Sequence, residues 1–391
     1  MMQYVYNWQI KRKMEYKYPE ARPEKQVAWV FDTNKCIACQ TCSLACKNAW
    51  TSGKGQEYMW WNNVETKPWG FYPLGYDVRI LDKLGAQEWR GDKYIGKSIF
   101  EAAPYGEEIP GFIPEEDDWL APNIGEDEVS SQVKDKDYLK IPHQPWMFYL
   151  QRICNHCTYP ACLAACPRKA IYKRKEDGIV LIDQKRCRGY QECVRACPYK
   201  KSMFRSYTQK SEKCISCFPG VEEGIQTQCV INCIGKIRIF GFSRYSGIPP
   251  KAGKSRYDQP QEDNPIDYLV HFKKIALPLY PQFGLEPNVY YIPPINVPEE
   301  FNQQLFGPGA KRAVQLYKKA SEDKKLIGLL MLFGSTDKII HSFKIEGDIE
   351  NGSVSGFSQE GKEIVRVPLT EPVIIRKEYD EKEDVYRQSV T

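Results

Sequence analysis

Fifteen cysteines are the residues of this chain whose types and spacing could do chemistry, and they gather in four short groups. The groups are Cys36-x2-Cys39-x2-Cys42-x3-Cys46, Cys154-x2-Cys157-x4-Cys162-x3-Cys166, Cys187-x5-Cys193-x3-Cys197 and Cys214-x2-Cys217-x11-Cys229-x3-Cys233. Spacings of two and three residues suit ligation of a metal group better than cross-links between distant segments. The odd total also argues against complete disulfide pairing. Zinc is an alternative, because the fourth group taken alone resembles a zinc ribbon.

The second and third groups enclose a predicted hairpin. Apolar Ile171 and residues 179–182 lie on either side of Glu176-Asp177-Gly178, which is a strong turn signal. This layout resembles that of bacterial two-cluster ferredoxins, in which three cysteines of a run hold one cluster and the fourth ligates the other. Tyr190 stands where the third group would carry its middle thiolate.

Ligand exchange of this kind predicts four sets of iron-ligating cysteines. The sets are Cys36, Cys39, Cys42 and Cys233; Cys46, Cys214, Cys217 and Cys229; Cys154, Cys157, Cys162 and Cys197; and Cys166, Cys187 and Cys193. Because a phenol is a poor substitute for a thiolate at iron, we expect three 4Fe–4S clusters and one 3Fe–4S cluster beside Tyr190. We interpret Tyr190 as a wall that blocks the fourth iron. The alternative is a fourth cubane with water or another oxygen ligand on its unique iron.

The other motifs of the sequence point away from catalysis. No nucleophile elbow, Walker loop, dinucleotide fingerprint or histidine metal motif occurs. His156 lies between Cys154 and Cys157 and is expected to be structural, the alternative being a hydrogen bond that tunes the neighbouring cluster. Four clusters in series suit the movement of single electrons, so we expect an electron-transfer protein without catalytic residues of its own.

The net charge of +5 counts every cysteine as a neutral thiol. Fifteen thiolates and roughly seven positive charges on the cluster cores would bring the loaded chain to about −3. Basic residues gather beside cysteines and not on a face with aromatic platforms, which argues against nucleic-acid binding. They are Lys35, Arg168, Lys169, Arg186, Arg188, Lys200, Lys201 and Lys213.

Short apolar segments beside the cysteine groups predict the elements that position them. Strands are expected at Val27–Phe31, Trp146–Ile153, Met203–Tyr207 and Ile237–Phe242. One pair of strands encloses the second and third groups, and the other pair encloses the whole. This order predicts an α+β fold with two nested ferredoxin-like modules, an inner one at residues 146–204 and an outer one at residues 27–50 plus 205–245.

The remaining segments carry no cysteine. Residues 1–26 are expected to form an arm on the body or on a partner. Residues 51–145 are too long for a structureless loop. They predict an inserted lobe that covers cofactors or binds a partner, the alternative being an ordinary packed insertion. This segment is rich in Trp, with acidic stretches: Trp60, Trp61, Trp69, Trp89, Trp119, Glu115–Asp118 and Glu126–Glu128.

Residues 246–391 are expected to contact neighbouring subunits. A helical region is predicted at Ala310–Phe333, strands at Ile339–Ile345, Glu363–Val367 and Val373–Arg376, and a charged, mobile tail from Lys377. The most apolar run, Leu326–Phe333, is too short to cross a membrane and reads as a core helix. The first residues, MMQYVYNWQIKRK, contain no apolar h-region and no paired arginines, so no export signal is expected.

Two long stretches, residues 36–73 and 152–201, resemble the four-cluster iron–sulfur β subunits of the DMSO reductase family of molybdenum enzymes. KCISC at 213–217 and ALPLYPQFGLEPNVYYIPP at 276–294 are similar but weaker matches. The nearest branch contains nitrite oxidoreductase, perchlorate reductase, selenate reductase, ethylbenzene dehydrogenase and dimethyl sulfide dehydrogenase, with the respiratory nitrate reductases related to it. Tyr190 is typical of this branch, whereas the classical nitrate reductases carry Trp there. Some nitrite oxidoreductase β subunits replace the fourth cysteine of the first group with aspartate, and this chain keeps Cys46.

The resemblance implies a catalytic α subunit with a molybdenum bis-pterin cofactor and a γ subunit with haem b. The Cys36, Cys39, Cys42 and Cys233 cluster would face the molybdenum subunit, and the Cys166, Cys187 and Cys193 cluster would face the haem. It also implies a periplasmic-type location on the outer side of the membrane, reached with a signal-bearing partner, the cytoplasm being the alternative. The expected substrate of the complex is nitrite or nitrate. Perchlorate, selenate, ethylbenzene or dimethyl sulfide enzymes and a free-standing polyferredoxin are the alternatives.

Overall fold

Four strands form the central sheet of the computed structural model, which describes residues 4–18, 23, 25–68, 72–103, 108–119, 146–243, 260–370 and 376–389. Their order is β12 (Arg238–Ser243), β3 (Gln26–Asp32), β14 (Val289–Ile292) and β13 (Leu277–Pro278). β12 runs antiparallel to β3, and β14 runs parallel to it. The strands predicted before the first cysteine group and after the fourth are therefore confirmed, and they are neighbours.

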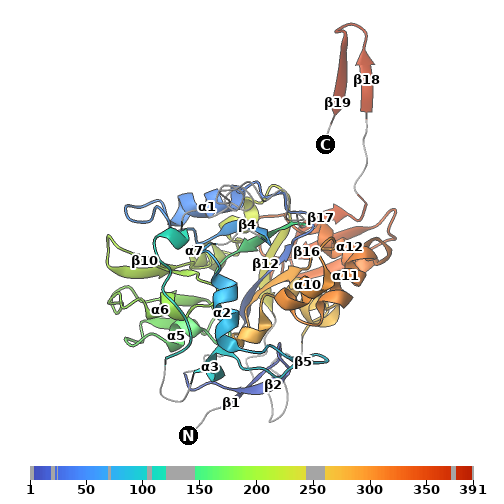
Figure 1. Cartoon of the computed structure of the whole chain (residues 1–391). Coiled ribbons are helices and arrows are strands. Elements are labelled where there is room, and N and C mark those ends of the chain that lie inside the picture. Colours follow the sequence, from blue (N-terminus) through green and yellow to red (C-terminus); the bar gives the residue numbers. More distant parts are fainter. Residues whose placement is uncertain are drawn as a thin grey trace, which may run out of the picture.

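The central sheet is buried on both faces because alternate residues of its strands enter two different cores. In β3, Val27, Trp29 and Phe31 join one apolar cluster. Ala28 and Val30, which point the other way, join a second cluster. The first core also contains Cys42, Cys157 and Cys229, whereas the second contains most of the buried C-terminal residues, such as Leu326 and Leu329; Leu305 and Phe306 belong to the first. The sheet thus separates a cysteine-bearing side from a C-terminal side (Figure 1).

The cysteine-bearing side consists of short helices and hairpins. The helices are α1 (Thr41–Trp50), α5 (Ala161–Ala164), α6 (Glu192–Ala196), α7 (Phe218–Glu222) and α8 (Gln228–Ile231). The hairpin predicted around Glu176-Asp177-Gly178 is confirmed as β8 (Ile171–Lys173) and β9 (Val180–Ile182). A second hairpin, β10 (Ser202–Arg205) with β11 (Lys210–Lys213), includes the strand predicted after the third group.

The two strands that flank the second and third groups do not pair with each other in the described structure. β7 (Phe148–Arg152) pairs with β4 (Asn63–Lys67), and β10 pairs with β11. β4 belongs to the segment expected as an inserted lobe. Of the inner strands, β10 therefore pairs with the next strand along the chain and β7 with a distant one, whereas the outer strands β3 and β12 pair with each other.

The N-terminal arm lies on the body. β1 (Tyr4–Asn7) and β2 (Arg12–Glu15) form a hairpin whose residues Val5 and Met14 are buried in the first core. The side-chain amide of Asn7 donates to the carbonyl of Gly284 at 3.0 Å, and Arg12 forms an ion pair with Glu101 at 2.6 Å. The arm was expected to lie on the body or on a partner, and its described residues lie on the body.

Residues 51–145 form a packed insertion wherever the structure describes them. The elements are β4, α2 (Tyr76–Leu84), β5 (Trp89–Arg90), β6 (Lys93–Tyr94), α3 (Ile99–Ala102) and a 3₁₀ turn at Asp117–Trp119. Ile80 and Phe100 enter the first core, and Arg152 of β7 pairs with buried Glu65 of β4. Trp69 and Glu126–Glu128 lie outside the described residues.

The C-terminal side is helical and then strand-rich. Its elements are α9 (Pro265–Asp267), a π-helical turn at Tyr268–Phe272, a 3₁₀ turn at Pro281–Phe283, α10 (Glu299–Phe306), α11 (Ala310–Lys318), a 3₁₀ turn at Ala320–Glu322, α12 (Lys324–Met331), β15 (Ser342–Glu346), β16 (Ser353–Phe357), β17 (Glu363–Pro368), β18 (Arg376–Asp380) and β19 (Val385–Ser389). α11 and α12 confirm the predicted helical region, and Leu326 and Leu329 of α12 are fully buried. β15 and β17 match predicted strands, whereas β16 between them was not predicted. Of the strand predicted at Val373–Arg376, residues 373–375 lie outside the described part. The tail expected to be mobile contains the β18–β19 hairpin.

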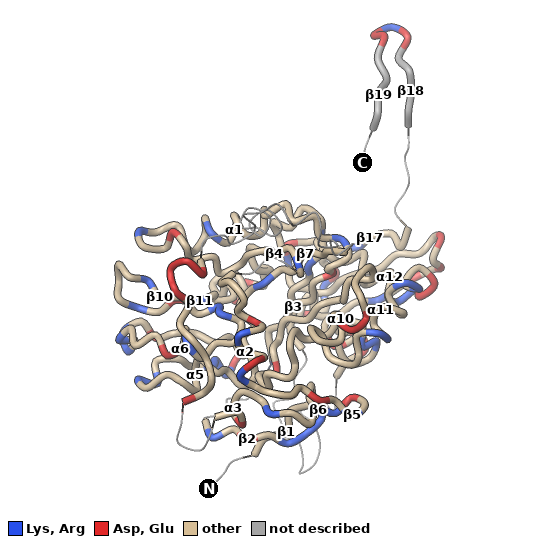
Figure 2. The backbone as a smooth tube through the Cα atoms, in the orientation of Figure 1, with Lys and Arg blue, Asp and Glu red and all other residues tan. Residues whose placement is uncertain are grey.

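The distribution of charged residues and the hydropathy of the helices are as expected from the sequence. Basic and acidic segments alternate along the chain, with no face of one sign in the view of Figure 2. No helix in the described ranges is long and apolar enough to cross a membrane.

Candidate metal-cluster sites

The fifteen cysteines are all described, all are free thiols, and they line four cavities. Each cavity contains about 310 to 380 Å³ of space without protein atoms. Site 1 is lined by Cys36, Cys39, Cys42 and Cys233; site 2 by Cys46, Cys214, Cys217 and Cys229; site 3 by Cys154, Cys157, Cys162 and Cys197; and site 4 by Cys166, Cys187 and Cys193. The structure therefore brings together the same four sets of cysteines that the sequence predicts.

The alternatives to a cluster fit this arrangement poorly. None of the cysteines is in a disulfide. The fourth group, which resembles a zinc ribbon in sequence, is divided between two cavities, because Cys233 lines site 1 while Cys214, Cys217 and Cys229 line site 2. Among the described residues, no three Cys, His, Asp or Glu side chains are arranged to hold one metal ion.

Two pairs of packed helices place the thiols. Helix α1 carries Cys42 toward site 1 and Cys46, about one turn later, toward site 2. Helix α8 packs on α1 and does the reverse, with Cys229 at site 2 and Cys233 just past its end at site 1. Helices α5 and α6 are paired in the same way between sites 3 and 4. Each Cys-x3-Cys step thus connects two neighbouring sites.

The loops before these helices curl tightly around the cavities. Gln40 before α1, Gln191 before α6 and Cys217 before α7 all have left-handed backbone, with φ of 61°, 59° and 48°. Curled backbone of this kind presents N–H groups to an anion. The N–H of Ser216 donates to Cys214 Sγ at 3.3 Å, and the N–H of Ala170 donates to Cys166 Sγ at 3.3 Å. Thiolates that receive N–H donors in this way fit an iron–sulfur cluster.

The buried thiols of these sites need a bound cation in order to lose their protons. Burial raises the pKa of Cys217 to about 11 and the pKa of Cys157 well above its usual value. Cys39 differs from these two, because it is exposed and a hydrogen bond from the Thr41 hydroxyl lowers its pKa. Buried thiols would stay protonated at neutral pH without positive charge beside them, and a coordinating metal ion deprotonates a thiol outright.

The sites adjoin in the order 1, 2, 3, 4: the α1–α8 pair connects sites 1 and 2, the α5–α6 pair connects sites 3 and 4, and Lys213 at site 3 is bonded to Cys214 at site 2. Burial is the main cause of the raised thiol pKa values, but charges from neighbouring sites add to it. The charge of Cys42 in site 1 raises the pKa of Cys229 in site 2. In the same way, Cys154 of site 3 raises the pKa of Cys214 in site 2, and Cys193 of site 4 raises that of Cys162 in site 3. Each site is therefore within electrostatic range of the next.

Tyr190 lines site 4, as the gap in the third group predicts. Its side chain is 61% exposed, so the phenol lies at the rim of the cavity and is not enclosed by it. The floor and walls come from residues such as Ile171, Ile182 and Ser211. Site 4 thus has three thiols and an open side that Tyr190 partly covers.

His156 lines site 3 and has the contacts of a packed residue. It is fully buried, its ring stacks on Trp29 with centroids 5.5 Å apart, and its Nδ1 accepts a hydrogen bond from the Val180 N–H at 3.0 Å. Burial lowers the pKa of His156 well below its usual value, so the ring is neutral. The structural role expected for this residue accounts for these contacts.

Arg238 and Trp50 are among the residues that contact the thiols and were missed by the sequence analysis. Arg238 donates to Cys42 Sγ at 3.0 Å, and Trp50 donates from Nε1 to Cys217 Sγ at 3.2 Å. A signal for Arg238 was present, because a charged residue at the start of the apolar strand Ile237–Phe242 needs a partner. The sequence held no comparable signal for Trp50, because it does not show which neighbour of α1 the side chain contacts.

Comparison with known proteins agrees with this geometry. Residues 145–243 match the 4Fe-4S dicluster domain family. The chain is 40% identical to chlorate reductase subunit beta of Ideonella dechloratans, over 81% of this chain and 98% of that protein. It is 41% identical to selenate reductase subunit beta of Thauera selenatis, over 74% of this chain and 89% of that protein. It is 34% identical to respiratory nitrate reductase 2 beta chain of Escherichia coli, over 69% of each.

Proposed function

Because this chain belongs to the iron–sulfur β subunits of molybdoenzymes, the family of the chlorate, selenate and nitrate reductase β chains, we propose that it carries single electrons between two partner subunits. The observation that carries the proposal is the row of four cysteine-lined sites, each close to the next. Iron–sulfur clusters at these sites would supply the one-electron redox chemistry. The chain itself holds the thiolates, directs N–H donors to them and excludes water.

Three 4Fe–4S clusters at sites 1, 2 and 3 and one 3Fe–4S cluster at site 4 are the cofactors we propose. The first three sites each have four thiols, and site 4 has three. Cys166, Cys187 and Cys193 would hold the 3Fe–4S cluster, with Tyr190 over its open side. The two helix pairs α1–α8 and α5–α6 support two nested ferredoxin-like modules.

The partners we propose are a molybdenum bis-pterin α subunit at site 1 and a haem b γ subunit at site 4. Both ends of the row present apolar side chains to the surface, as interaction sites do. At site 1, Ile37 and Ile234 are 68% and 67% exposed, and Cys39 itself is exposed. At site 4, the exposed ring is Tyr190. Electrons would enter or leave through these two ends.

Nitrite oxidation or nitrate reduction is the reaction we propose for the complex, since the stretches at 56–73 and 152–201 resemble nitrite oxidoreductase. A second candidate is the reduction of another oxyanion, because identity is 40% and 41% to chlorate and selenate reductase subunits and 34% to a nitrate reductase chain. A free-standing polyferredoxin is disfavoured, since the match covers 98% of a β subunit. For location we propose the outer side of the membrane, with the cytoplasm as the alternative.

Purification of the native complex tests the proposal. We expect the chain to copurify with a large molybdenum subunit and a haem b subunit. Iron counted on the chain should be about fifteen, with a 3Fe–4S EPR signal in the oxidised protein and cubane signals on reduction. Turnover of nitrite, nitrate, chlorate and selenate by that complex identifies the substrate. One or two irons together with bound zinc would refute the electron-transfer function.

A further inference from the structure

Arg238 is a buried cation between sites 1 and 2. Its side chain is 1% exposed and lines site 1, where Nη2 donates to Cys42 Sγ at 3.0 Å. Its Nη1 donates at 3.1 Å to Oδ1 of Asn62, a residue that lines site 2. The guanidinium also lies over the ring of Phe31, 4.5 Å from its centroid. One side chain therefore reaches both sites.

The counter-charges of Arg238 are thiolates. Its side-chain contacts among the described residues are the thiols of Cys42 and Cys229, an amide and an aromatic ring, and none is a carboxylate. A guanidinium group stays protonated in proteins, so Arg238 keeps its charge although it is buried. Arg152 makes the contrast clear, since it is equally buried and pairs with Glu65. A buried cation without a carboxylate is costly unless other negative charge is beside it.

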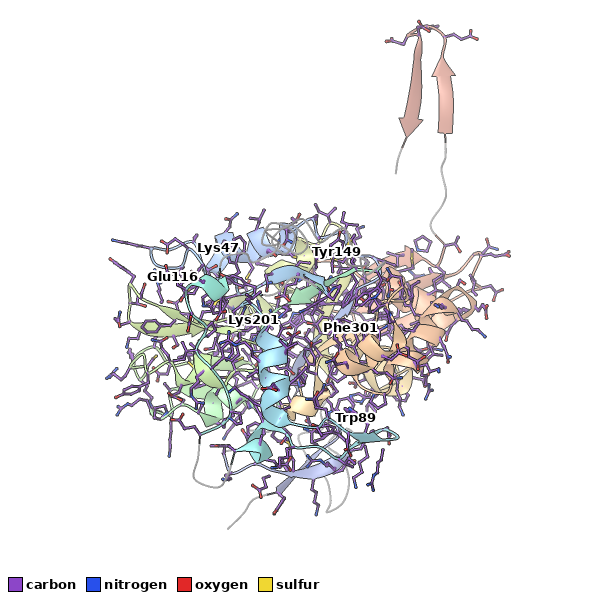
Figure 3. The ribbon with its side chains drawn as sticks, in the orientation of Figure 1. Lys47, Trp89, Glu116, Tyr149, Lys201 and Phe301 are labelled. Carbon is purple, nitrogen blue, oxygen red and sulfur yellow. The ribbon has the colours of Figure 1, made fainter. Side chains whose placement is uncertain are left out.

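Lys213 occupies the corresponding position between sites 2 and 3. It is 3% exposed, lines site 3, and donates to the carbonyls of Val180 and of Cys214, a site 2 residue, the latter at 2.8 Å. Lys213 shares its cavity with Cys154 and Cys162 and directly precedes Cys214 in the chain, so thiols of both sites lie close to it. Lys201 also lines site 3 (Figure 3), but its ammonium group donates to the carbonyl of Trp60 at 3.2 Å and to Oδ1 of Asn63, both in the inserted segment.

We propose that Arg238 and Lys213 are fixed cations that set the redox potentials of the clusters on either side of them. Arg238 acts on sites 1 and 2, and Lys213 acts on sites 2 and 3. Each electron that a cluster accepts adds one negative charge, and a cation a few ångströms away in a low-dielectric interior favours that reduced state. The inference rests on the proposed function, since it requires clusters at these sites.

The test is a redox titration, followed by EPR, of the purified complex carrying Arg238→Gln or Lys213→Gln. Arg238→Gln keeps hydrogen-bond donors but removes the charge. At a fixed ambient potential it should lower the ratio of reduced to oxidised cluster at sites 1 and 2 at least tenfold, which is about 59 mV for one electron. The potential of the cluster at site 4 should not change. Lys213→Gln should instead lower the potentials of the clusters at sites 2 and 3. Arg238→Lys, which keeps the charge, should stay closer to the wild type.

Arg12→Gln is the matched control, because Arg12 pairs with Glu101 and lines none of the four sites. Asn62→Asp is a second test for the case that the Arg238→Gln variant does not retain its iron. It places a carboxylate where Nη1 now donates at 3.1 Å and offsets the charge without removing the side chain, so the same two potentials should fall. Unchanged potentials in assembled variants would overturn the inference. Absence of clusters from the wild-type complex would instead refute the proposed function, and iron counting separates the two failures.

Discussion

The backbone N–H of Val27 donates to the carbonyl oxygen of Asp177 at 2.9 Å. Val27 belongs to β3, which leads into the first cysteine group, and Asp177 lies in the turn between β8 and β9. Beside this bond, Gly178 approaches Gln26 so closely that a Cβ on the glycine would lie 2.4 Å from Gln26 Oε1. The outer and inner cysteine-bearing segments therefore meet backbone to backbone.

Gly178→Ala should destabilise the protein more than a glycine replacement at an equally left-handed but open position. Gly178 has φ of +74°, which costs about 1 kcal/mol or more for alanine, and the clash with Gln26 adds to that cost. Gly224→Ala is the control, because Gly224 has φ of +78° and nothing lies within 4 Å of its Cβ position. Thermal unfolding followed by circular dichroism measures both. Equal losses of stability in the two variants would mean that Gln26 moves away from the new Cβ atom at no cost in free energy.

The grouping of the cysteines could be predicted because the two-cluster ferredoxin pattern assigns the last cysteine of each group to the neighbouring cluster. A Cys-x3-Cys step on a helix directs two thiols to two neighbouring sites whatever the rest of the chain does, as Cys42 and Cys46 show on α1. The β8–β9 hairpin was predictable from its local sequence, since Gly178 can take the left-handed conformation that its turn requires.

Pairings between distant segments could not be predicted. Residues 289–292 enter the central sheet beside β3, but their apolar pattern would fit any buried strand. Likewise β7 has β4 as its partner, which no local signal indicates. The contact between Arg238 and Cys42 joins residues 196 positions apart, so only the folded chain reveals it.

Trp50→Phe should lower the potential of the site 2 cluster. It removes the indole N–H that donates to Cys217 Sγ at 3.2 Å while keeping an aromatic ring in place. A hydrogen bond worth about 1 kcal/mol more to the reduced cluster corresponds to about 40 mV for one electron. EPR-monitored titration measures the shift. Trp119→Phe, in the same apolar cluster as Trp50, should leave the potential unchanged. A similar shift in both variants would assign the effect to packing.

Cys39→Ala should convert the cubane of site 1 into a 3Fe–4S cluster, because three thiols then remain there, as at site 4. About one iron per chain should be lost, and one cubane EPR signal should be replaced by a second 3Fe–4S signal. Reduction or oxidation of the other clusters through the catalytic subunit should slow, while chemical reductants still reach them. Leu44→Ala, an exposed position on α1, is the control. Unimpaired transfer through the catalytic subunit would show that site 1 is not the entry point.

Tyr190→Cys should convert site 4 into a site with four thiols. The side chain is 61% exposed, so the substitution should change stability by less than about 0.5 kcal/mol. The iron count should rise from about fifteen to about sixteen, the EPR signal of the oxidised protein should disappear, and the potential of this centre should fall, because a further thiolate adds negative charge. Tyr190→Phe keeps three thiols and should behave like the wild type. If the cysteine variant keeps the wild-type spectrum and potential, Tyr190 does not occupy the position of the missing ligand.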